Sequence, residues 1–230
     1  FLPGGKEQIA GEYQPGWMLL SYGKKVSVSS SLEGYPAENI VDEDARTAWV
    51  AQSNRDMEWA QIDLQRLSSI HAIQVNFDEY GANQKGAVSG VYQSYLIYAS
   101  VNGEDWSLVV DYGTKKTDTP HDYIEFEEPF KARYIKLQNK EYMVSENFSV
   151  RDLRIFGKGQ GSTPRAVNDF TVERDEADPC KARLCWEAVP DAQGYIVRYG
   201  IAGDKLYNNF QVMGENTLEI GSLNKKETTL

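Results

Sequence analysis

The sequence predicts an all-β protein of two domains, and four features support this. Aromatic residues make up 12% of the 230 residues, and such residues favour strands. Short runs of alternating apolar and polar residues are separated by turn residues, which is typical of a β-sandwich or barrel. No run shows a convincing 3.6-residue helical periodicity. Finally, segment 157–164 (GKGQGSTP) is rich in Gly, Ser and Pro and marks a boundary.

The clearest strand is 73–77, where Ile73, Val75 and Phe77 alternate with polar residues, as in a half-buried strand. Asn102-Gly103 predicts a type I′ hairpin, because both positions tolerate a positive φ. The other strands expected before the boundary are 25–29, 59–64, 95–100, 106–110, 123–126, 132–137 and 153–156; after it we expect 170–173, 182–186, 195–199 and 218–220.

The boundary divides the chain into four parts. We expect an N-terminal linker segment at 1–16, a first domain at 17–157, a linker at 158–165 and a second domain at 166–230. Residues 1–7 lack the basic and apolar regions of a signal peptide, although one could have been removed upstream. No apolar run approaches the ~20 residues of a membrane-spanning helix, so we expect no membrane insertion.

The net charge of −10 disfavours two classes of partner. Nucleic-acid binders present a basic face, and anionic lipids attract clustered Lys and Arg. Neither feature is present, so a neutral ligand or a metal ion is favoured. The two cysteines, Cys180 and Cys185, are expected to be free thiols, because five steps along one strand separate them too far for a disulfide.

Five segments of the first domain carry a family resemblance when taken in order. They are 37–49 (AENIVDEDARTAW), 59–64 (WAQIDL), 100–106 (SVNGEDW), 132–137 (ARYIKL) and 151–157 (RDLRIFG). Together they resemble the discoidin, or coagulation factor V/VIII type C, family, whose bacterial branch includes the family 32 carbohydrate-binding modules. The resemblance implies a jelly-roll β-sandwich. Glu43 stands where the family usually has Gly, and Asp152 where it usually has Glu.

The second domain resembles a fibronectin type III module, an immunoglobulin-like β-sandwich. A Trp ends one strand (184–186, LCW), and a Tyr-x-Val-x-Tyr run follows at 195–199. Segment 222–230 resembles the approach to the last two strands, so we expect this sandwich to be incomplete. The pairing also resembles the C-terminal region of bacterial family 43 xylosidase or arabinosidase relatives, as segment 198–207 suggests. Their catalytic propeller would precede Phe1.

The loop at 39–47 is a candidate calcium site, because Asp42, Asp44 and Thr47 offer oxygens within six residues and Ca²⁺ takes six to eight oxygen ligands. The alternative is an acidic solvated loop in which Thr47 caps a turn, and sodium is a further possibility. The resemblance implies main-chain carbonyl ligands from Asn39, Asp44, Thr47 and Arg151, carboxylates from Asp42 and Asp152, and the Thr47 hydroxyl. Such an ion would be structural.

Four long segments between strands are candidates for a sugar-binding surface: 32–36, 52–58, 79–93 and 140–148. Sugars are held by aromatic stacking and planar polar groups, and long ordered loops tend to carry function. The residues we select are Arg55, Tyr80, Asn83, Tyr92 and Tyr142, and ordinary loop packing is the alternative for each. We expect Trp49, Trp59 and Trp106 to lie in the core.

No catalytic constellation is visible. Both histidines lack a partner motif, no glycine-rich phosphate loop is present, and the paired acids are better explained by the metal loop. We therefore expect a non-catalytic, carbohydrate-binding accessory region of a secreted, periplasmic or cell-surface bacterial polysaccharide-degrading glycosidase. Its partners would be a polysaccharide or oligosaccharide and the upstream catalytic domain. The alternatives are a structural spacer or brace without its own ligand, and a surface adhesion module.

Overall fold

The structure is a computed structural model that describes residues 16–82, 90–159, 165–190, 192, 194–203 and 205–223. The chain divides into two compact units, unit 1 at Phe1–Gly159 and unit 2 at Gln160–Leu230. In the described residues the helical element is one 3₁₀ turn, η1 (Ala37–Val41), and all other elements are strands. No helix in these ranges is long and apolar enough to cross a membrane.

Unit 1 contains eight strands in the part of the chain that the structure describes. They are β1 (Met18–Leu19), β2 (Lys25–Val28), β3 (Trp49–Val50), β4 (Trp59–Phe77), β5 (Gln93–Ser100), β6 (Ser107–Tyr112), β7 (His121–Tyr142) and β8 (Ser149–Gly159).

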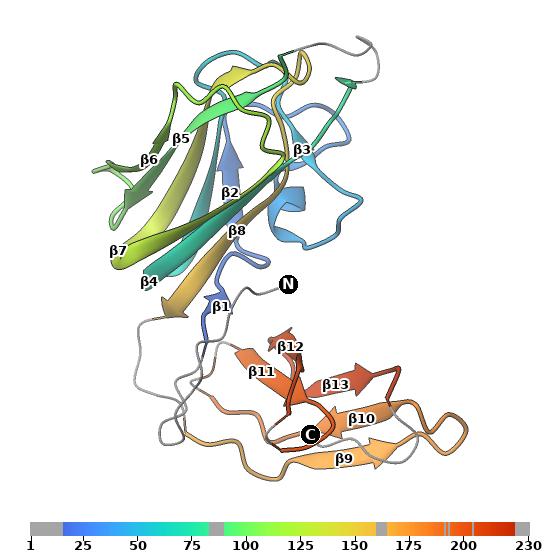
Figure 1. Cartoon of the computed structure of the whole chain (residues 1–230). Coiled ribbons are helices and arrows are strands. Elements are labelled where there is room, and N and C mark those ends of the chain that lie inside the picture. Colours follow the sequence, from blue (N-terminus) through green and yellow to red (C-terminus); the bar gives the residue numbers. More distant parts are fainter. Residues whose placement is uncertain are drawn as a thin grey trace. The chain divides into compact units, whose positions relative to one another are not determined.

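Two long strands, β4 and β7, build both layers of the sandwich (Figure 1). The first part of β4 pairs with β2 and with the second part of β7, which continues to β5 and β6. The later part of β4 pairs with the first part of β7 and with β8, which also pairs with β1 and β3. A register shift follows Asp63, and Gln65 adopts a φ of 66° at the bend.

The strands expected at 59–64 and 73–77 are therefore two parts of β4, and those expected at 123–126 and 132–137 are two parts of β7. The intervening residues remain within the strands and do not form loops, although register shifts interrupt the antiparallel ladder between Asp63 and Ser68 and between Ile70 and Ala72. The Asn-Gly turn also differs from expectation. Gly103 has a φ of 83°, but Asn102 is not in the left-handed region, so the turn is not type I′.

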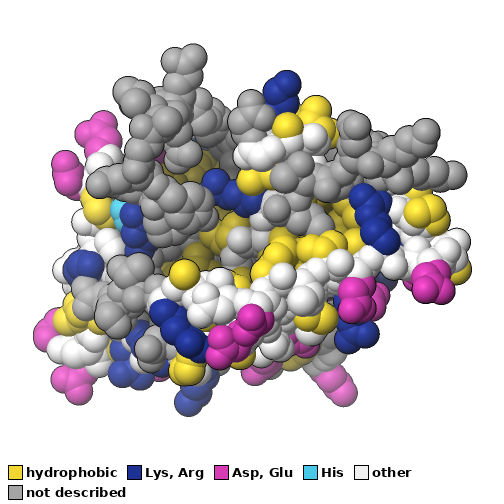
Figure 2. Space-filling model, turned by 90° about the horizontal axis from the view of Figure 1, so that it is seen from below, with side chains coloured by type: hydrophobic (Ala, Val, Ile, Leu, Met, Phe, Trp, Pro, Cys, Tyr) yellow, Lys and Arg dark blue, Asp and Glu magenta, His cyan; other side chains and the backbone are white. Residues whose placement is uncertain are grey.

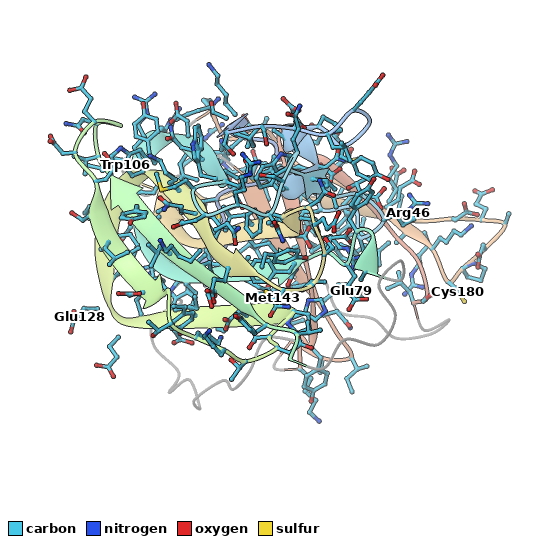
Figure 3. All side chains as sticks on the ribbon, turned by 90° about the horizontal axis from the view of Figure 1, so that it is seen from above. Arg46, Glu79, Trp106, Glu128, Met143 and Cys180 are labelled. Atoms are coloured by element: carbon cyan, nitrogen blue, oxygen red, sulfur yellow. The ribbon has the colours of Figure 1, made fainter. Side chains whose placement is uncertain are left out.

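The prediction that three tryptophans of unit 1 lie in the core is right for Trp49, which is fully buried, and wrong for the other two. Trp59 and Trp106 are half-buried and flank Lys136, whose ammonium lies 5.5 Å and 3.9 Å from their ring centroids. Burial lowers the pKa of Lys136. In the view from above, Trp106 lies on the opposite side of unit 1 from Arg46 (Figure 3).

Unit 2 has strands β9 (Thr171–Arg174), β10 (Ala182–Cys185), β11 (Gly194–Tyr199), β12 (Asn208–Met213) and β13 (Thr217–Ile220). They form a three-stranded sheet, β13-β10-β9, and a two-stranded sheet, β11-β12. Both cysteines are free thiols, as predicted. The sequence did not indicate β12, because only two apolar residues, Phe210 and Val212, alternate with polar neighbours there. In the structure Phe210 is exposed.

Candidate functional site

Connecting segments from distant parts of unit 1 meet at one end of the sandwich. Main-chain hydrogen bonds join 29–36 to 50–58 (Leu32 N to Val50 O, 2.7 Å) and 50–58 to 143–148 (Phe148 N to Ser53 O, 2.9 Å). The segment after β4 joins the start of β8 through Asp78 N and Ser149 O, 3.1 Å apart. Met143 N also donates to Tyr92 O (3.0 Å), so all four predicted loop segments have residues at this end, which we call the loop end (Figure 1).

Glu58 ties two of these segments together. Its Oε2 accepts hydrogen bonds from the hydroxyls of Ser29 and Ser30, and its Oε1 accepts one from Ser53 (2.7 Å). Burial raises the pKa of Glu58, but the three hydroxyls and nearby Arg55 outweigh it, so the pKa is lowered overall. No sequence pattern marked this network, because Ser29, Ser30 and Ser53 lie 29, 28 and five residues before Glu58 in the sequence.

Three asparagine side chains hold loop backbone in place. Asn54 Nδ2 donates to Ser145 O (2.8 Å), and Asn139 Nδ2 donates to the carbonyls of Asn54 and Arg55 (2.8 and 2.9 Å). Asn147 Nδ2 donates to Ala51 O (2.8 Å). Such side-chain to main-chain bonds restrict the backbone of the loops, so the surface above them is preorganised.

Two of the predicted ligand residues present side chains at the loop end. Arg55 is exposed, while its main-chain carbonyl is anchored by Asn139. Tyr80 is half-buried and packs edge-on against half-buried Tyr35, with ring centroids 4.9 Å apart. Asn83 lies outside the described residues.

Tyr92 belongs to a polar cluster. Its hydroxyl donates to Glu141 Oε2 (2.8 Å), and the ammonium of Lys116 lies 5.1 Å from its ring centroid. The Tyr92 hydroxyl and Lys116 lower the pKa of Glu141. One side of the Tyr92 ring is thus already in contact with a cation, which leaves less of the ring for stacking on a sugar.

The selection of Tyr142 as a ligand residue is wrong for this conformation, because its side chain is only 1% exposed. Its hydroxyl donates to Asp78 O and lies 3.1 Å from Ser149 Oγ, and burial raises the pKa of the phenol. The reason is a register shift in β7: Lys140 has no partner in the β5–β7 ladder. Before the shift the odd-numbered residues Leu137 and Asn139 are buried, and after it the even-numbered Tyr142 points into the core.

The predicted metal loop brings three ligand atoms together. Thr47 Oγ1 lies 2.8 Å from Asp42 Oδ2 and 3.0 Å from Asp44 O. The Asp44 carboxylate turns away to Arg46 (2.9 and 3.0 Å), whose hydrogen bonds lower the pKa of Asp44 to about 2. Asn39 uses its side chain on Ala48 O (2.8 Å). The Thr47 hydroxyl thus contacts both the Asp42 carboxylate and the Asp44 carbonyl, which is compatible with the metal loop and equally with a turn capped by Thr47.

The second half of the predicted metal site lies on β8. Arg151 has no partner in the β4–β8 ladder, because the register shifts between Asn76–Asp152 and Phe77–Val150. Within the described residues the Asp152 carboxylate, 8% exposed, accepts a hydrogen bond from Asn76 Nδ2 (2.8 Å) and pairs with no cationic side chain. A buried carboxylate normally has a cation or a metal beside it.

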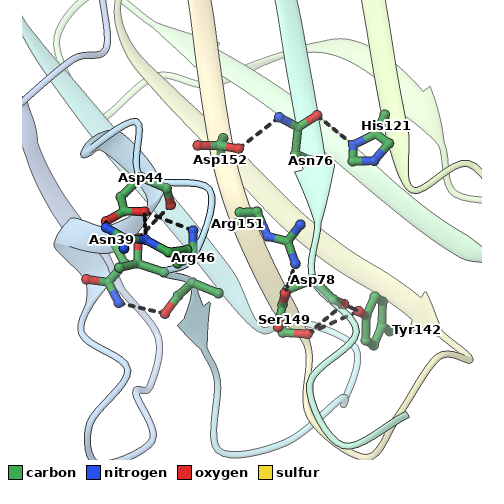
Figure 4. A network of polar contacts seen from close by, with 12 residues as sticks. Asn39, Asp44, Arg46, Asn76, Asp78, His121, Tyr142, Ser149, Arg151 and Asp152 are labelled. Atoms are coloured by element: carbon green, nitrogen blue, oxygen red, sulfur yellow. Dashed lines mark hydrogen bonds and ion pairs between the residues drawn. The ribbon is translucent and has the colours of Figure 1, made fainter. Parts of the chain in front are cut away.

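Figure 4 shows these two halves as separate groups. The Asn39–Arg46 group lies on the loop, whereas Asp152, Asn76 and His121 form a chain across three strands, and no drawn contact joins the groups. Among the described residues no three His, Cys, Asp or Glu side chains are arranged to hold a metal ion. The predicted site needs only two carboxylates, since its other ligands are carbonyls and a hydroxyl. Carboxylate, carbonyl and hydroxyl oxygens are the ligand types that Ca²⁺ takes.

Residues 25–152, more than half of the chain, match the F5/8 type C domain family. The chain belongs to this family. Lactadherin from Rattus norvegicus is 32% identical over 110 residues, which are 45% of this chain and 25% of lactadherin, and lactadherin from Mus musculus is 31% identical over 110 residues, with 45% and 23% covered. The chain thus spans about a quarter of the length of these relatives.

Two solved structures share the fold of the F5/8 type C domain. Chitosan-binding module 1 from a chitosanase/glucanase of Paenibacillus sp. IK-5 has a TM-score of 0.51 and 19% identity, and covers 61% of this chain and 99% of its own. Module 2 of the same enzyme, in complex with chitotriose, has a TM-score of 0.51 and 20% identity, with 60% and 99% covered. These likenesses confirm the predicted all-β discoidin-type sandwich for unit 1.

One departure from the family pattern now has a physical explanation. Glu43, which stands where Gly was expected, has a φ of 60°, a left-handed conformation that favours glycine. Its carboxylate forms a bidentate ion pair with Arg154 (2.7 and 3.1 Å). This pair fastens the 39–47 loop to β8, two residues beyond Asp152.

Proposed function

We propose that the F5/8 type C domain of this chain binds carbohydrate at its loop end and is not itself an enzyme. The observation that carries the proposal is the preorganised surface there: Glu58, Asn54 and Asn139 fasten the loops, while Arg55 and the Tyr35–Tyr80 pair remain accessible. The chitosan-binding modules with the same fold support a sugar as the ligand class.

The chemistry of these side chains suits a sugar. A tyrosine ring packs against the apolar C–H face of a pyranose, while the Arg55 guanidinium and the exposed Gln52 amide can hydrogen-bond its hydroxyls. Because the loops are already fastened, little conformational entropy is lost on binding. The net charge of −10 favours neutral or cationic glycans over polyanionic ones.

Calorimetric titration with xylan, arabinan and chitotriose tests the proposal. We expect binding to at least one of these glycans and about a tenfold or greater loss of affinity in Tyr80→Ala and in Arg55→Ala, since each removes a contact worth roughly 1.4 kcal/mol or more. Tyr22→Ala is the matched control, because exposed Tyr22 precedes β2 whereas the 29–36 segment follows it. No heat with any glycan across a broad panel would overturn the proposal.

We also propose that the F5/8 type C domain holds one structural calcium ion. Asp42, Thr47 and the Asp44 carbonyl would ligate it from the loop, and the Asp152 carboxylate and Arg151 carbonyl from β8, with Asn39 adding a carbonyl. The uncompensated carboxylate of Asp152 supports this proposal. When bound, the ion would neutralise the acids and fasten the loop to β8.

Thermal unfolding with and without a chelator tests the calcium proposal. We expect chelation to lower the Tm of the purified protein by several degrees, and Asp152→Asn to abolish that difference. Restoration by Ca²⁺ but not by Na⁺ would identify the ion as calcium, whereas restoration by Na⁺ alone would identify sodium. A Tm that does not respond to the chelator would contradict a structural calcium ion.

We further propose that the chain is the accessory region of a secreted bacterial polysaccharide-degrading glycosidase of the xylosidase or arabinosidase type, and that unit 2 is a partial fibronectin type III-like module. The motifs at 184–186, 195–199 and 198–207 support this context. Glycosidase activity of the full-length protein on xylan or arabinan, retained when residues 1–230 are deleted, is the expected result. A full-length protein without such activity would contradict it.

A further inference from the structure

Lys136 of β7 lies on the outer face of the layer formed by β2, the first part of β4, the second part of β7, β5 and β6. Its neighbours Ile135 and Leu137 are fully buried, so the Lys136 side chain points away from the core. The ladder places Gln61 of β4 opposite Lys136 on one side and Tyr98 of β5 on the other. Directly opposite residues share a face of a sheet, so these three side chains form a row.

The turn that follows β5 brings a tryptophan to this row. The side chains of Ser100 and Asn102 accept hydrogen bonds of 2.9–3.3 Å from four main-chain N–H groups of the turn. Gly103 packs so closely on β7 that a Cβ added to it would lie 3.3 Å from the Tyr134 ring. The turn is therefore held against the outer face of the sheet, and Trp106 at its end is positioned beside Lys136.

The Lys136 ammonium has aromatic neighbours but no anionic one. It lies 3.9 Å from the ring centroid of Trp106 and 5.5 Å from that of Trp59. Within the described residues it forms no ion pair and no hydrogen bond. Burial lowers its pKa, and no acidic side chain opposes that shift. The ammonium is thus half-buried and fixed between two indoles without a counter-charge.

Two other basic residues of the same strand have acidic partners. Arg133 pairs with Asp63 (2.8 Å), and Lys140 pairs with Asp56 (2.6 Å). In the view from below, positive and negative side chains are interspersed along the lower border of the face shown (Figure 2). Lys136 differs because its counter-charge is missing from the described part of the chain, so an anion from outside can supply it.

The surroundings of Lys136 restrict which anion fits. The two indoles attract the ammonium to their faces but do not neutralise it, and a carboxylate would form a charge-assisted hydrogen bond with it. Trp59 and Trp106 are half-buried and present apolar surface beside the charge. The side-chain amide of Gln61 forms no hydrogen bond with the residues that the structure describes. A ligand that combines a carboxylate, an apolar face and hydroxyl groups would use all of these features.

We propose that this row, with Trp59 and Trp106 beside it, is a second glycan-binding surface that recognises the carboxylate of a uronic acid residue. The carboxylate pairs with Lys136, the C–H groups of the sugar ring lie on the exposed parts of the indoles, and the Gln61 amide bonds a hydroxyl. In the view from above, Trp106 lies on the other side of unit 1 from Glu79 of the loop end (Figure 3). The surface therefore extends the proposed carbohydrate binding but does not require the loop-end site.

Other anions satisfy fewer of these features. A phosphate or sulfate ion would pair with the ammonium but leave the indoles and the Gln61 amide without contacts. An acidic peptide side chain carries its carboxylate on a flexible stem and has no rigid ring to lie on the indoles. The net charge of −10 disfavours polyanions, so the fitting ligand carries few carboxylates among neutral sugars.

Titration of the whole chain with xylotriose that bears one glucuronic acid residue tests the proposal. The matched probe is the same oligosaccharide with its carboxyl group reduced to an alcohol, and the indole N–H signals of Trp59 and Trp106 are followed by NMR. We expect saturable shifts of both signals with the charged probe. We expect the reduced probe to bind about tenfold or more weakly, because it cannot form the charge-assisted hydrogen bond.

Protein variants locate the site. Lys136→Gln should weaken binding of the charged probe about tenfold or more and remove the difference between the two probes. Lys136→Arg keeps the charge and stacks on aromatic rings, so it should retain that difference. Lys131→Gln is the matched control, because Lys131 is exposed on the same strand and the change in net charge is the same. Unchanged far-UV circular dichroism and an unchanged Tm establish that each variant is folded.

Three results would overturn the proposal. One is equal affinity of the wild-type protein for the two probes. Another is a blocked glutamate that shifts both indole signals with the affinity of the charged oligosaccharide, because the ligand would then be an acidic side chain of a protein. The third is loss of these shifts in Tyr80→Ala, which would place the uronic acid at the loop end. Failure of neutral glycans to bind at the loop end is a separate outcome and leaves this proposal unaffected.

Discussion

The two units differ in how each surrounds its buried tryptophan. In unit 1, Trp49 is fully buried, its Nε1 donates to Ser30 O (3.0 Å), and its ring packs edge-on against Phe148 with centroids 5.8 Å apart. In unit 2, Trp186 is nearly as buried, but it lines an open groove and its Nε1–H lacks an acceptor among the described residues. A tryptophan is thus enclosed within the core of unit 1, whereas in unit 2 a tryptophan lies at the edge of the core, beside a groove.

Strand length explains the contrast. In unit 1, β4 and β7 each contribute to both layers, so the apolar face of one layer is covered by the continuation of its own strands. In unit 2 the described strands have four or six residues, and they form separate sheets of three and two strands. In unit 1 the core is therefore covered by long strands that bend from one layer into the other, whereas in unit 2 two separate short-stranded sheets share one smaller core.

The largest expected effect is on the closed core. Trp49→Ala should lower the free energy of unfolding of unit 1 by about 3–5 kcal/mol, because it removes a fully buried indole and leaves a cavity. Urea denaturation followed by circular dichroism measures the change. Val101→Ala, at an exposed position of the same unit, should change stability by less than about 0.5 kcal/mol. A Trp49→Ala variant as stable as Val101→Ala would mean that unit 1 is not closed around Trp49.

A conservative substitution of each tryptophan compares the two units directly. Trp49→Phe leaves the carbonyl of Ser30 without its indole donor, which costs roughly 1–3 kcal/mol beyond the loss of size. Trp186→Phe removes a donor that is already unpaired, so it should cost about 1 kcal/mol less than Trp49→Phe. Denaturation of both variants under one set of conditions tests this. Equal losses would show that the Trp186 Nε1–H is satisfied in solution.

The fold of unit 1 could be predicted from the sequence because its signals are local. Motifs such as 59–64 and 132–137 mark strand segments. It is harder to predict which side chains of a strand face the core. Lys140, which has no partner in the β5–β7 ladder, reverses the alternation in β7 and buries Tyr142, and no sequence pattern indicates such a bulge. The outward positions of Trp59 and Trp106 were missed because a large aromatic residue by itself favours burial.

The candidate site could be predicted only as a set of loops. Arg55 and Tyr80 are at the loop end, but which residues fasten it depends on contacts between segments far apart in sequence, such as Asn54 with Ser145 and Asn139 with Arg55. Those contacts follow from how β4 and β7 return to the same end. That arrangement becomes visible only when the strands are paired.

The smallest expected effect concerns the bend that makes β4 serve two layers. Asp63 accepts two hydrogen bonds of 2.8 Å from Arg133 of β7 immediately before the register shift, and these bonds lower the pKa of Asp63. Because the folded-state pKa is below the ordinary value of 3.8, the stabilisation is present above that value and is lost as the pH falls through the folded-state pKa.

Asp63→Asn should therefore destabilise unit 1 at pH 7 by about 0.2–1 kcal/mol, since the pair is partly exposed and solvent screens it, and the difference from wild type should shrink as the pH is lowered toward 2. Urea denaturation across this pH range measures both quantities. The comparable pair in unit 2, Arg165 with Glu187, is more exposed, so Glu187→Gln should have a smaller effect. If Glu187→Gln cost more than Asp63→Asn, ion pairing at the β4 bend would not contribute to the greater closure of unit 1.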